Sequence, residues 1–210
     1  SIAIDIGHSV KNFGALSSEG AKEYNFNFNI AYMLFARLIS MGYNDITIIN
    51  KNGDNISLRE RADQINNTNA DILISIHHDS VQPHYLKRKT INGKNFLYTK
   101  DHKGFSIFYS KNNTQNISSL KLSKLVGQNF KKNKLSPSLH HAENIKGENK
   151  ELVDSVNGIY NADFAILRLS NMPSILIECG IIVNPDEEML LKNKEYQEKI
   201  VNSIAHSIDD

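Results

Sequence analysis

The chain has one cysteine, four prolines, no excess of either charge and no long apolar run. The single cysteine, Cys179, excludes an internal disulfide, and it also excludes zinc fingers or ribbons built on paired cysteines. No run approaches the roughly 18 consecutive apolar residues that a membrane-spanning helix needs. No heptad pattern persists either, so the sequence predicts neither a membrane span nor a coiled coil.

The charge balance argues against a nucleic-acid partner. Lys and Arg number 24 against 23 Asp and Glu, which leaves a formal charge of +1. A chain with so little net charge has a weak attraction for phosphates, although Lys131, Lys132 and Lys134 form a local basic patch. With 210 residues, 40% of them apolar, we expect one globular domain with a substantial core.

Strand and helix patterns alternate along the chain. Apolar runs predict strands, and apolar residues that recur every three or four positions predict helices. The expected strands are 2–6, 45–50, 71–77, 105–109 and 174–178, and the expected helices are 23–41, 57–66, 118–132 and 186–208. Ser57, with Glu60 three residues on, is typical of a helix N-cap. Residues 82–104 and 135–158 are polar, with a weak helical pattern over 148–156.

This alternation predicts the fold class. Strands joined through helices form right-handed crossovers, which give a parallel sheet covered on both faces. We therefore expect an α/β fold: a single domain, phosphorylase/hydrolase-like, whose mostly parallel twisted sheet carries helices on both faces.

Titratable side chains follow three of the expected strands. His8, His77 and Glu178 each stand where an apolar run ends, and ligands of open parallel sheets bind beyond the carboxyl ends of the strands. Two histidines and one carboxylate are the minimal protein shell of a catalytic zinc ion. The carboxylate is either Glu178 or another acid such as Glu23, which stands in the first turn of the first helix, where the helix dipole favours a negative charge.

These segments resemble a known family, the zinc N-acetylmuramoyl-L-alanine amidases called amidase_3. The resemblance spans nearly the whole chain in the same order. It rests on Ile4-Asp-Ile-Gly-His8, Gly14-Ala15, Gly20 with Glu23 and Asn27, Asp54 to Leu58, Arg61 to Asn66, Ala70 to His77, Ala162 to Arg168, Met172 to Gly180 and Asn184-Pro185. Around the first histidine the family usually reads DPGHGG, whereas this chain has Asp5-Ile-Gly-His-Ser-Val10, a departure that leaves the histidine in place.

The resemblance implies a role for each site residue. His8, Glu23 and His77 would bind one zinc ion, and Glu178 would be the catalytic general base. The implied reaction is hydrolysis of the amide bond between the lactyl group of N-acetylmuramic acid and the L-alanine of the stem peptide. His78 follows His77, but alternation along a strand turns it to the other face, so we expect it to support the site or the core.

The substrate implies where the protein acts. Peptidoglycan lies outside the cytoplasmic membrane, so the resemblance implies export to the periplasm or the cell wall. The chain begins directly on its first apolar run, so we expect either a cytosolic protein or, given this substrate, an exported one whose leader is absent from this chain. The sequence identifies no activator protein.

Two stretches, about 82–104 and 135–158, look longer than the compact form of the family. Some relatives block the zinc with an inserted helix that supplies a glutamate, and the second stretch contains Glu143, Glu148 and Glu151. We therefore expect either a solvated surface or a segment that gates the site.

Two other functions are compatible with this fold. A zinc exopeptidase commonly binds two metals, and the sequence reveals no spare Asp/Glu/His set for a second ion. A catalytically silent peptidoglycan-binding domain is disfavoured because all four site residues are present. Cys179 has no histidine at a spacing that suggests a nucleophilic dyad, so we expect it to be a small buried hydrophobic residue.

Overall fold

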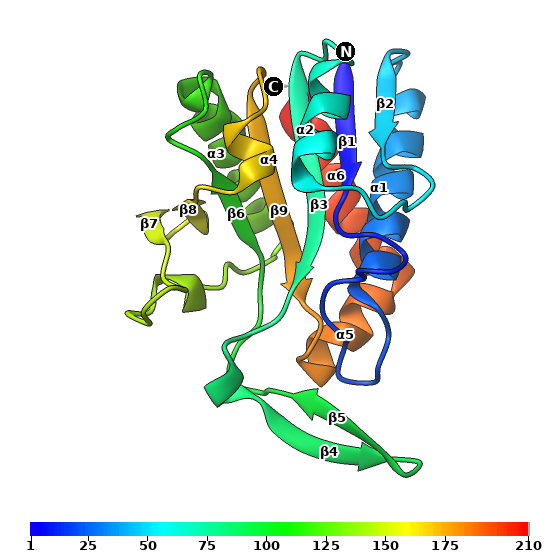
Figure 1. Ribbon diagram of the computed structural model, residues 1–210, viewed down its shortest axis with the longest axis vertical. Coiled ribbons are helices and arrows are strands. Elements are labelled where there is room, and N and C mark those ends of the chain that lie inside the picture. Colours follow the sequence, from blue (N-terminus) through cyan, green and yellow to red (C-terminus); the bar gives the residue numbers. More distant parts are fainter. Residues whose placement is uncertain (210) are drawn as a thin grey trace.

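A seven-stranded sheet runs through the centre of the molecule (Figure 1). The computed structural model describes residues 1–209. The strand order is β2-β1-β3-β9-β6-β8-β7. The strands are β1 (Ile2–Ile6), β2 (Ile46–Ile49), β3 (Ile72–Asp79), β6 (Ser106–Tyr109), β7 (Glu151–Asp154), β8 (Ile159–Asn161) and β9 (Ser174–Ile181). All neighbours pair in parallel except β6 with β9 and β7 with β8, so the predicted mostly parallel α/β sheet is confirmed.

Helices cover both faces of this sheet, as the sequence predicts. In Figure 1, α2 (Leu58–Asn66) and α4 (Ala165–Arg168) lie in front of it, whereas α1 (Glu23–Ser40), α5 (Pro185–Lys192) and α6 (Lys194–Asp209) lie behind it. The helix α3 (Asn116–Lys132) packs on the same face as α1 and α6. Alternate strand residues supply the two cores: Ile4 packs with α1 and α6, whereas its neighbour Ala3 faces the core that contains Ile65 of α2.

Local sequence explains where the first two helices begin. At α2, the Ser57 hydroxyl accepts a hydrogen bond from the Glu60 amide, and the Glu60 carboxylate accepts one from the Ser57 amide, as predicted. The helix α1 begins at Glu23 itself. Because that end of α1 lies beside the strand edge, the position of Glu23 depends on this helix start.

A buried ion pair ties α2 to the end of β1. Arg61 Nη1 lies 2.9 Å from Asp5 Oδ1 and donates to the Ile6 carbonyl at 2.6 Å, while Nη2 donates to the His8 carbonyl at 2.6 Å. Asp5 also accepts a hydrogen bond of 2.7 Å from the Ser75 hydroxyl on β3. Arg61 therefore compensates a buried carboxylate and fixes the backbone that carries His8.

The structure corrects three expectations about elements. The helix predicted over 148–156 is wrong, because Glu151–Asp154 pair with β8 as strand β7. The single closing helix predicted over 186–208 is two helices, because Asn193 is extended and its side chain accepts from the Tyr196 amide to start α6. The strands carrying His77 and Glu178 continue to Asp79 and Ile181, so both residues lie within strands rather than at their ends.

Residues 82–104 contain a β-hairpin that extends away from the sheet (Figure 1). A short 3-10 helix, η1 (Pro83–Tyr85), precedes strands β4 (Lys87–Ile91) and β5 (Lys94–Tyr98). The turn is Asn92-Gly93, both with positive φ. Asn-Gly is a strong signal for such a hairpin, and sequence analysis overlooked it here. That this stretch and 135–158 are insertions stays a prediction.

No helix within residues 1–209 is long and apolar enough to cross a membrane.

The Arg61 ion pair makes a testable prediction. Arg61→Ala leaves Asp5 buried without its partner, and we expect the free energy of unfolding to fall by about 3–5 kcal/mol. Arg59→Ala is the matched control from the same helix, because Arg59 is 74% exposed and its partner Asp63 57% exposed. That variant should change stability by no more than about 0.5 kcal/mol. Urea denaturation measures both, and equal losses would contradict this role of Arg61.

Candidate metal centre and active site

The structure brings together three of the four site residues named from the sequence. Glu23 Oε1 lies 3.1 Å from His8 Nε2 and 3.3 Å from His77 Nδ1. The two imidazole rings meet edge to face, with centroids 4.9 Å apart. One carboxylate oxygen thus faces a nitrogen of each histidine, and the three side chains could hold one metal ion.

Different elements supply these side chains. His8 follows β1 in a loop where its backbone is left-handed, with φ of 67°, and Arg61 holds its carbonyl. His77 lies in β3, the parallel neighbour of β1. Glu23 opens α1 and reaches the strand edge from the face that α1 covers. The convergence therefore needs the β1–β3 pairing and the packing of α1.

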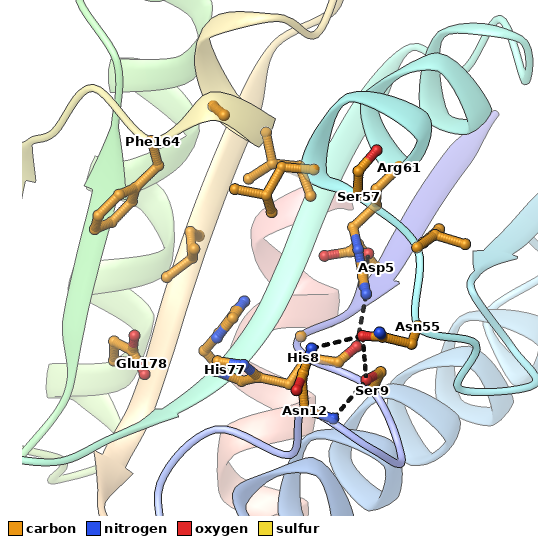
Figure 2. A pocket seen from close by; sticks show the side chains of 16 residues that line it. Asp5, His8, Ser9, Asn12, Asn55, Ser57, Arg61, His77, Phe164 and Glu178 are labelled. Carbon is orange, nitrogen blue, oxygen red and sulfur yellow. Dashed lines mark hydrogen bonds and ion pairs between the residues drawn. The ribbon is translucent and has the colours of Figure 1, made fainter.

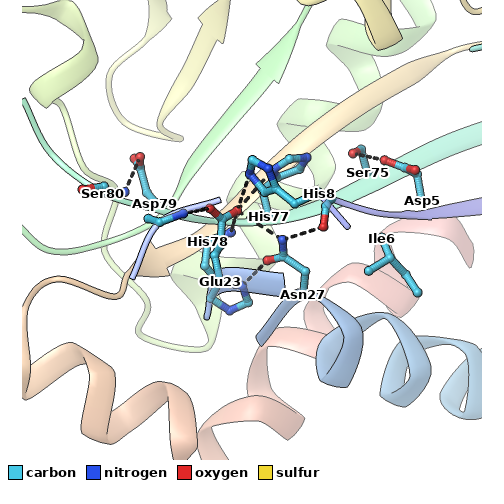
Figure 3. Close-up of polar contacts among 12 residues, drawn as sticks. Asp5, Ile6, His8, Glu23, Asn27, Ser75, His77, His78, Asp79 and Ser80 are labelled. Carbon is cyan, nitrogen blue, oxygen red and sulfur yellow. Dashed lines mark hydrogen bonds and ion pairs between the residues drawn. The ribbon is translucent and has the colours of Figure 1, made fainter. Parts of the chain in front are cut away.

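Hydrogen bonds hold the Glu23 carboxylate in place (Figure 3). Its Oε2 accepts from the Ala15 amide at 2.9 Å, and its Oε1 accepts from the Asn27 side chain at 3.1 Å. Burial alone would raise the pKa of Glu23, but hydrogen bonds with His77 and His8 outweigh that effect and hold the pKa far below its usual range. Glu23 is therefore an anion placed to bind a cation.

His78 points away from this cluster, as the strand alternation predicts (Figure 3). It is buried, and its Nδ1 lies 2.8 Å from Oδ1 of Asn27, the residue that also binds Glu23. Burial lowers the pKa of His78 to about 3, so the ring is neutral at physiological pH. His78 thus supports the position of Glu23 through Asn27.

Glu178 faces the cluster across a cavity of about 560 Å³ (Figure 2). His77 and Glu178 are register partners on the paired strands β3 and β9, and both line this cavity together with His8, Arg61 and Phe164. Glu178 Oε2 has no hydrogen-bond partner among the described residues. Burial, with the nearby charges of Asp79 and Glu23, raises the pKa of Glu178 well above its usual value.

Glu178 and Glu23 therefore have opposite electrostatic environments. A carboxylate with a raised pKa is suited to accept and release a proton, whereas one with a lowered pKa stays an anionic ligand. Which of the two acids binds a metal and which moves a proton stays a prediction.

Cys179, next to Glu178, lies on the other side of β9 and is 1% exposed. Burial raises the pKa of its thiol well above the ordinary value. The expected burial of Cys179 is confirmed, and a protonated core thiol is unsuited to nucleophilic attack.

The glutamates of residues 135–158 lie away from this cavity. Glu143 accepts a hydrogen bond of 2.8 Å from the Tyr85 hydroxyl, Glu151 pairs with Lys111, and Glu148 lines a second cavity. In the described part of the chain, none of the three lines the cavity that contains His8 and His77. Gating of the site by this segment stays a prediction, and it would require the segment to move.

The structure also contains a second metal-type cluster, which contradicts the expectation that no spare set exists. Asp79, His140 and His141 each offer a ligand atom, and these atoms lie within 4.8 Å of one another. Sequence analysis missed the set because its members are about sixty residues apart, on β3 and in the 3-10 helix η2 (His140–Ala142). The adjacent histidines His140 and His141 were the sequence feature that could have indicated this cluster.

Comparisons with known proteins identify the family and agree with the fold. The sequence profile of the family described as N-acetylmuramoyl-L-alanine amidase, Amidase_3, matches residues 2–210. AmiA, an N-acetylmuramoyl-L-alanine amidase of Escherichia coli K12, is 27% identical over 99% of this chain and 74% of its own length. A candidate amidase of Buchnera aphidicola from Acyrthosiphon pisum is 33% identical over 97% of this chain and 90% of its own.

A solved structure has the same architecture. The crystal structure of N-acetylmuramoyl-L-alanine amidase from Clostridium difficile 630 aligns with a TM-score of 0.73 and 26% identity, covering 99% of this chain and 93% of that one. The family match, over residues 2–210, extends over the whole sheet. The chain belongs to the Amidase_3 family of N-acetylmuramoyl-L-alanine amidases.

Proposed function

We propose that this chain hydrolyses the amide bond between N-acetylmuramic acid and the L-alanine of the peptidoglycan stem peptide, with one zinc ion held by His8, Glu23 and His77. The observation that carries the proposal is the convergence of both imidazoles on one Glu23 oxygen, opposite Glu178 in an open cavity. The family match supports the reaction and the substrate class.

The surroundings of the cluster fit a zinc ion. Two imidazole nitrogens and one carboxylate oxygen are a donor set that zinc accepts, with a fourth position left open. Glycines let these ligands approach the backbone closely: a Cβ on Gly14 would lie 2.2 Å from Glu23 Oε2, and a Cβ on Gly7 would lie 2.4 Å from the His77 ring. When bound, zinc lowers the pKa of water and polarises a carbonyl group.

In this proposal the protein's own residues move the proton. Glu178 takes a proton from the attacking water and delivers it to the departing amine, because an amide nitrogen leaves only when protonated. The Arg61 contact to the His8 carbonyl and the Asn27 contact to Glu23 keep the ligands in place while this happens.

The location of the protein follows from the proposed substrate. Peptidoglycan lies outside the cytoplasmic membrane, so we propose that the protein acts in the periplasm or cell wall after export. Peptidoglycan or its muropeptides would be its partner, and nucleic acid would not.

A zinc exopeptidase remains the alternative to compare, because the second cluster removes one argument against it. The family match over residues 2–210 favours the amidase. Incubation with purified sacculi separates the two: the amidase releases intact stem peptides with a new L-alanine amino terminus, whereas an exopeptidase releases single amino acids.

Glu178→Gln should abolish turnover while the protein keeps its fold and its zinc. Glutamine occupies the same space but does not accept a proton, and loss of a general base typically costs a factor of about 10²–10⁴. Stem-peptide release from sacculi and metal content by mass spectrometry measure the two properties. An unchanged rate would remove Glu178 from the mechanism, and lost zinc would make Glu178 a ligand and Glu23 the candidate base.

Activity should fall as the pH decreases from about 7 to about 5. Histidine binds zinc only when neutral, and free imidazole titrates near about 6.5. Glu178 works as a base only when ionised, and its raised pKa moves the loss of the ionised form to a higher pH than for ordinary glutamate. Initial rates on soluble muropeptides across this range provide the measurement. A rate that stays constant down to about pH 4 would contradict a histidine-bound metal.

Gly14→Ala should lower zinc affinity, and Gly42→Ala should not. Both glycines have positive φ, 76° and 96°, so alanine is strained at either position by about 1 kcal/mol. Only at Gly14 would the added Cβ collide with Glu23 and His8, since nothing lies within 4 Å at Gly42. Competition with a zinc chelator measures affinity for each variant. Equal affinities would show that Gly14 is not needed for the ligand arrangement.

A further inference from the structure

Asp79, His140 and His141 repeat the geometry of the first cluster. Asp79 Oδ2 lies 2.7 Å from His141 Nε2 and 3.4 Å from His140 Nε2. The corresponding distances from Glu23 Oε1 to its two histidines are 3.1 and 3.3 Å. In both places one carboxylate oxygen faces two imidazole nitrogens, which come from distant residues in the first cluster and from the adjacent His140 and His141 in the second. From this repetition we propose that Asp79, His140 and His141 bind a second divalent transition-metal ion of the zinc class.

Neighbours hold the other polar atoms of Asp79 and His140. Asp79 Oδ1 accepts a hydrogen bond of 2.8 Å from the Ser80 amide, which leaves Oδ2 for the cluster. His140 Nδ1 lies 2.8 Å from the Ser138 hydroxyl, which leaves Nε2 directed at Asp79. Contacts to the second ring nitrogen orient most metal-binding histidines in this way. The ligand atoms of Asp79 and His140 are therefore pre-positioned before any ion enters.

A buried amide borders the same cavity. Gln82 is 5% exposed and lines, with the three cluster residues, a separate cavity of about 290 Å³. Its nitrogen donates to the His140 carbonyl at 3.0 Å, but its Oε1 has no hydrogen-bond partner among the described residues. An unpartnered buried amide oxygen is costly, and a cation or its water in this cavity would satisfy it.

The donor set indicates which metal the site takes. Imidazole nitrogens suit zinc and its transition-metal neighbours, whereas calcium and magnesium favour shells made of oxygen. His140 is 2% exposed, so its ring lies inside the protein rather than in solvent. Lys150 is the one lysine or arginine among the described residues that line this cavity. Its ammonium lies over the Phe164 ring, 5.9 Å from the ring centre.

The two clusters share a strand but no ligand. His77 and Asp79 are two residues apart on β3, and Figure 3 shows both on the side opposite His78. Glu23 belongs to the first cluster and Asp79 to the second, so each ion would have its own carboxylate. The second ion would fasten residues 140–141 to the strand that carries His77.

Metal stoichiometry tests the proposal. Protein stripped with a chelator, reloaded with Zn²⁺ and dialysed should retain about two ions per chain, because each cluster offers three protein ligands. His141→Ala and His77→Ala should each retain about one, and the double variant about none. His206→Ala, which removes an exposed histidine from α6, is the matched control and should equal the unaltered protein. The His77→Ala protein reports the second cluster alone, so its result does not depend on amidase activity.

Asp79→Asn tests the site without removing a ring. Asparagine keeps the shape and a hydrogen bond to His141 but lacks the charge, so zinc affinity in the His77→Ala background should fall at least about tenfold. In a Co²⁺ titration of the same background, the visible absorption that arises from Co²⁺ at the second cluster should also be lost. Circular dichroism checks that the variant keeps its fold. Either of two results would overturn the proposal: one zinc ion per chain in the unaltered protein, or a zinc content that neither His141→Ala nor Asp79→Asn changes. The cluster would then be a hydrogen-bonded ion pair without a metal.

Discussion

The parallel register of β1, β3 and β9 is the constraint on which the site depends. Ile6 pairs with Ile76, and His77 pairs with Glu178. His8, which follows Ile6 closely in the chain, therefore lies at the same end of the sheet as His77 and Glu178. Parallel strands need long crossovers, which here contain α1 and α2. Those crossovers deliver Glu23 from one face and Arg61 from the other, so the connections that make the sheet parallel also supply the ligand and the residue that fixes the His8 loop.

Two carboxylates at the same strand edge are kept in different states by what surrounds them. Glu23 is enclosed by hydrogen-bond donors and two imidazoles, which favours its anion. Glu178 lines the same cavity with one oxygen unpartnered and with Asp79 and Glu23 nearby, which disfavours its anion. Desolvation acts on both, so the difference comes from the neighbouring donors and charges. This separation of environments supports the proposal that Glu23 is a fixed ligand and Glu178 a proton carrier.

Sequence periodicity predicts the elements whose signals are local. The Ser57–Glu60 capping box, the apolar spacing of Ile30, Leu34 and Leu38, and the β-branched strands depend on neighbours within a few residues, and all appear in the structure. The helix predicted over 148–156 fails because strand pairing with β8 outweighs a weak helical preference. The meeting of His8 and His77 was predictable because the carboxyl ends of parallel strands lie at one edge of a sheet. Spacing left Glu23 and Glu178 as alternatives for the carboxylate, and only the family resemblance favoured Glu23.

Contacts made by irregular segments were not predictable in the same way. Periodicity does not indicate where residues 135–158 return to the sheet, because they contain only the short elements η2 and β7. The structure places His140 and His141 against Asp79, two positions along β3 from His77, and Tyr160 and Phe108 pack around the His141 ring. A polar stretch with a buried histidine has a specific partner, since burying an imidazole without one is unfavourable. Of the three glutamates that suggested a gate, Glu143 contacts Tyr85 and Glu151 contacts Lys111. The neighbouring His140 and His141 contact Asp79 on β3.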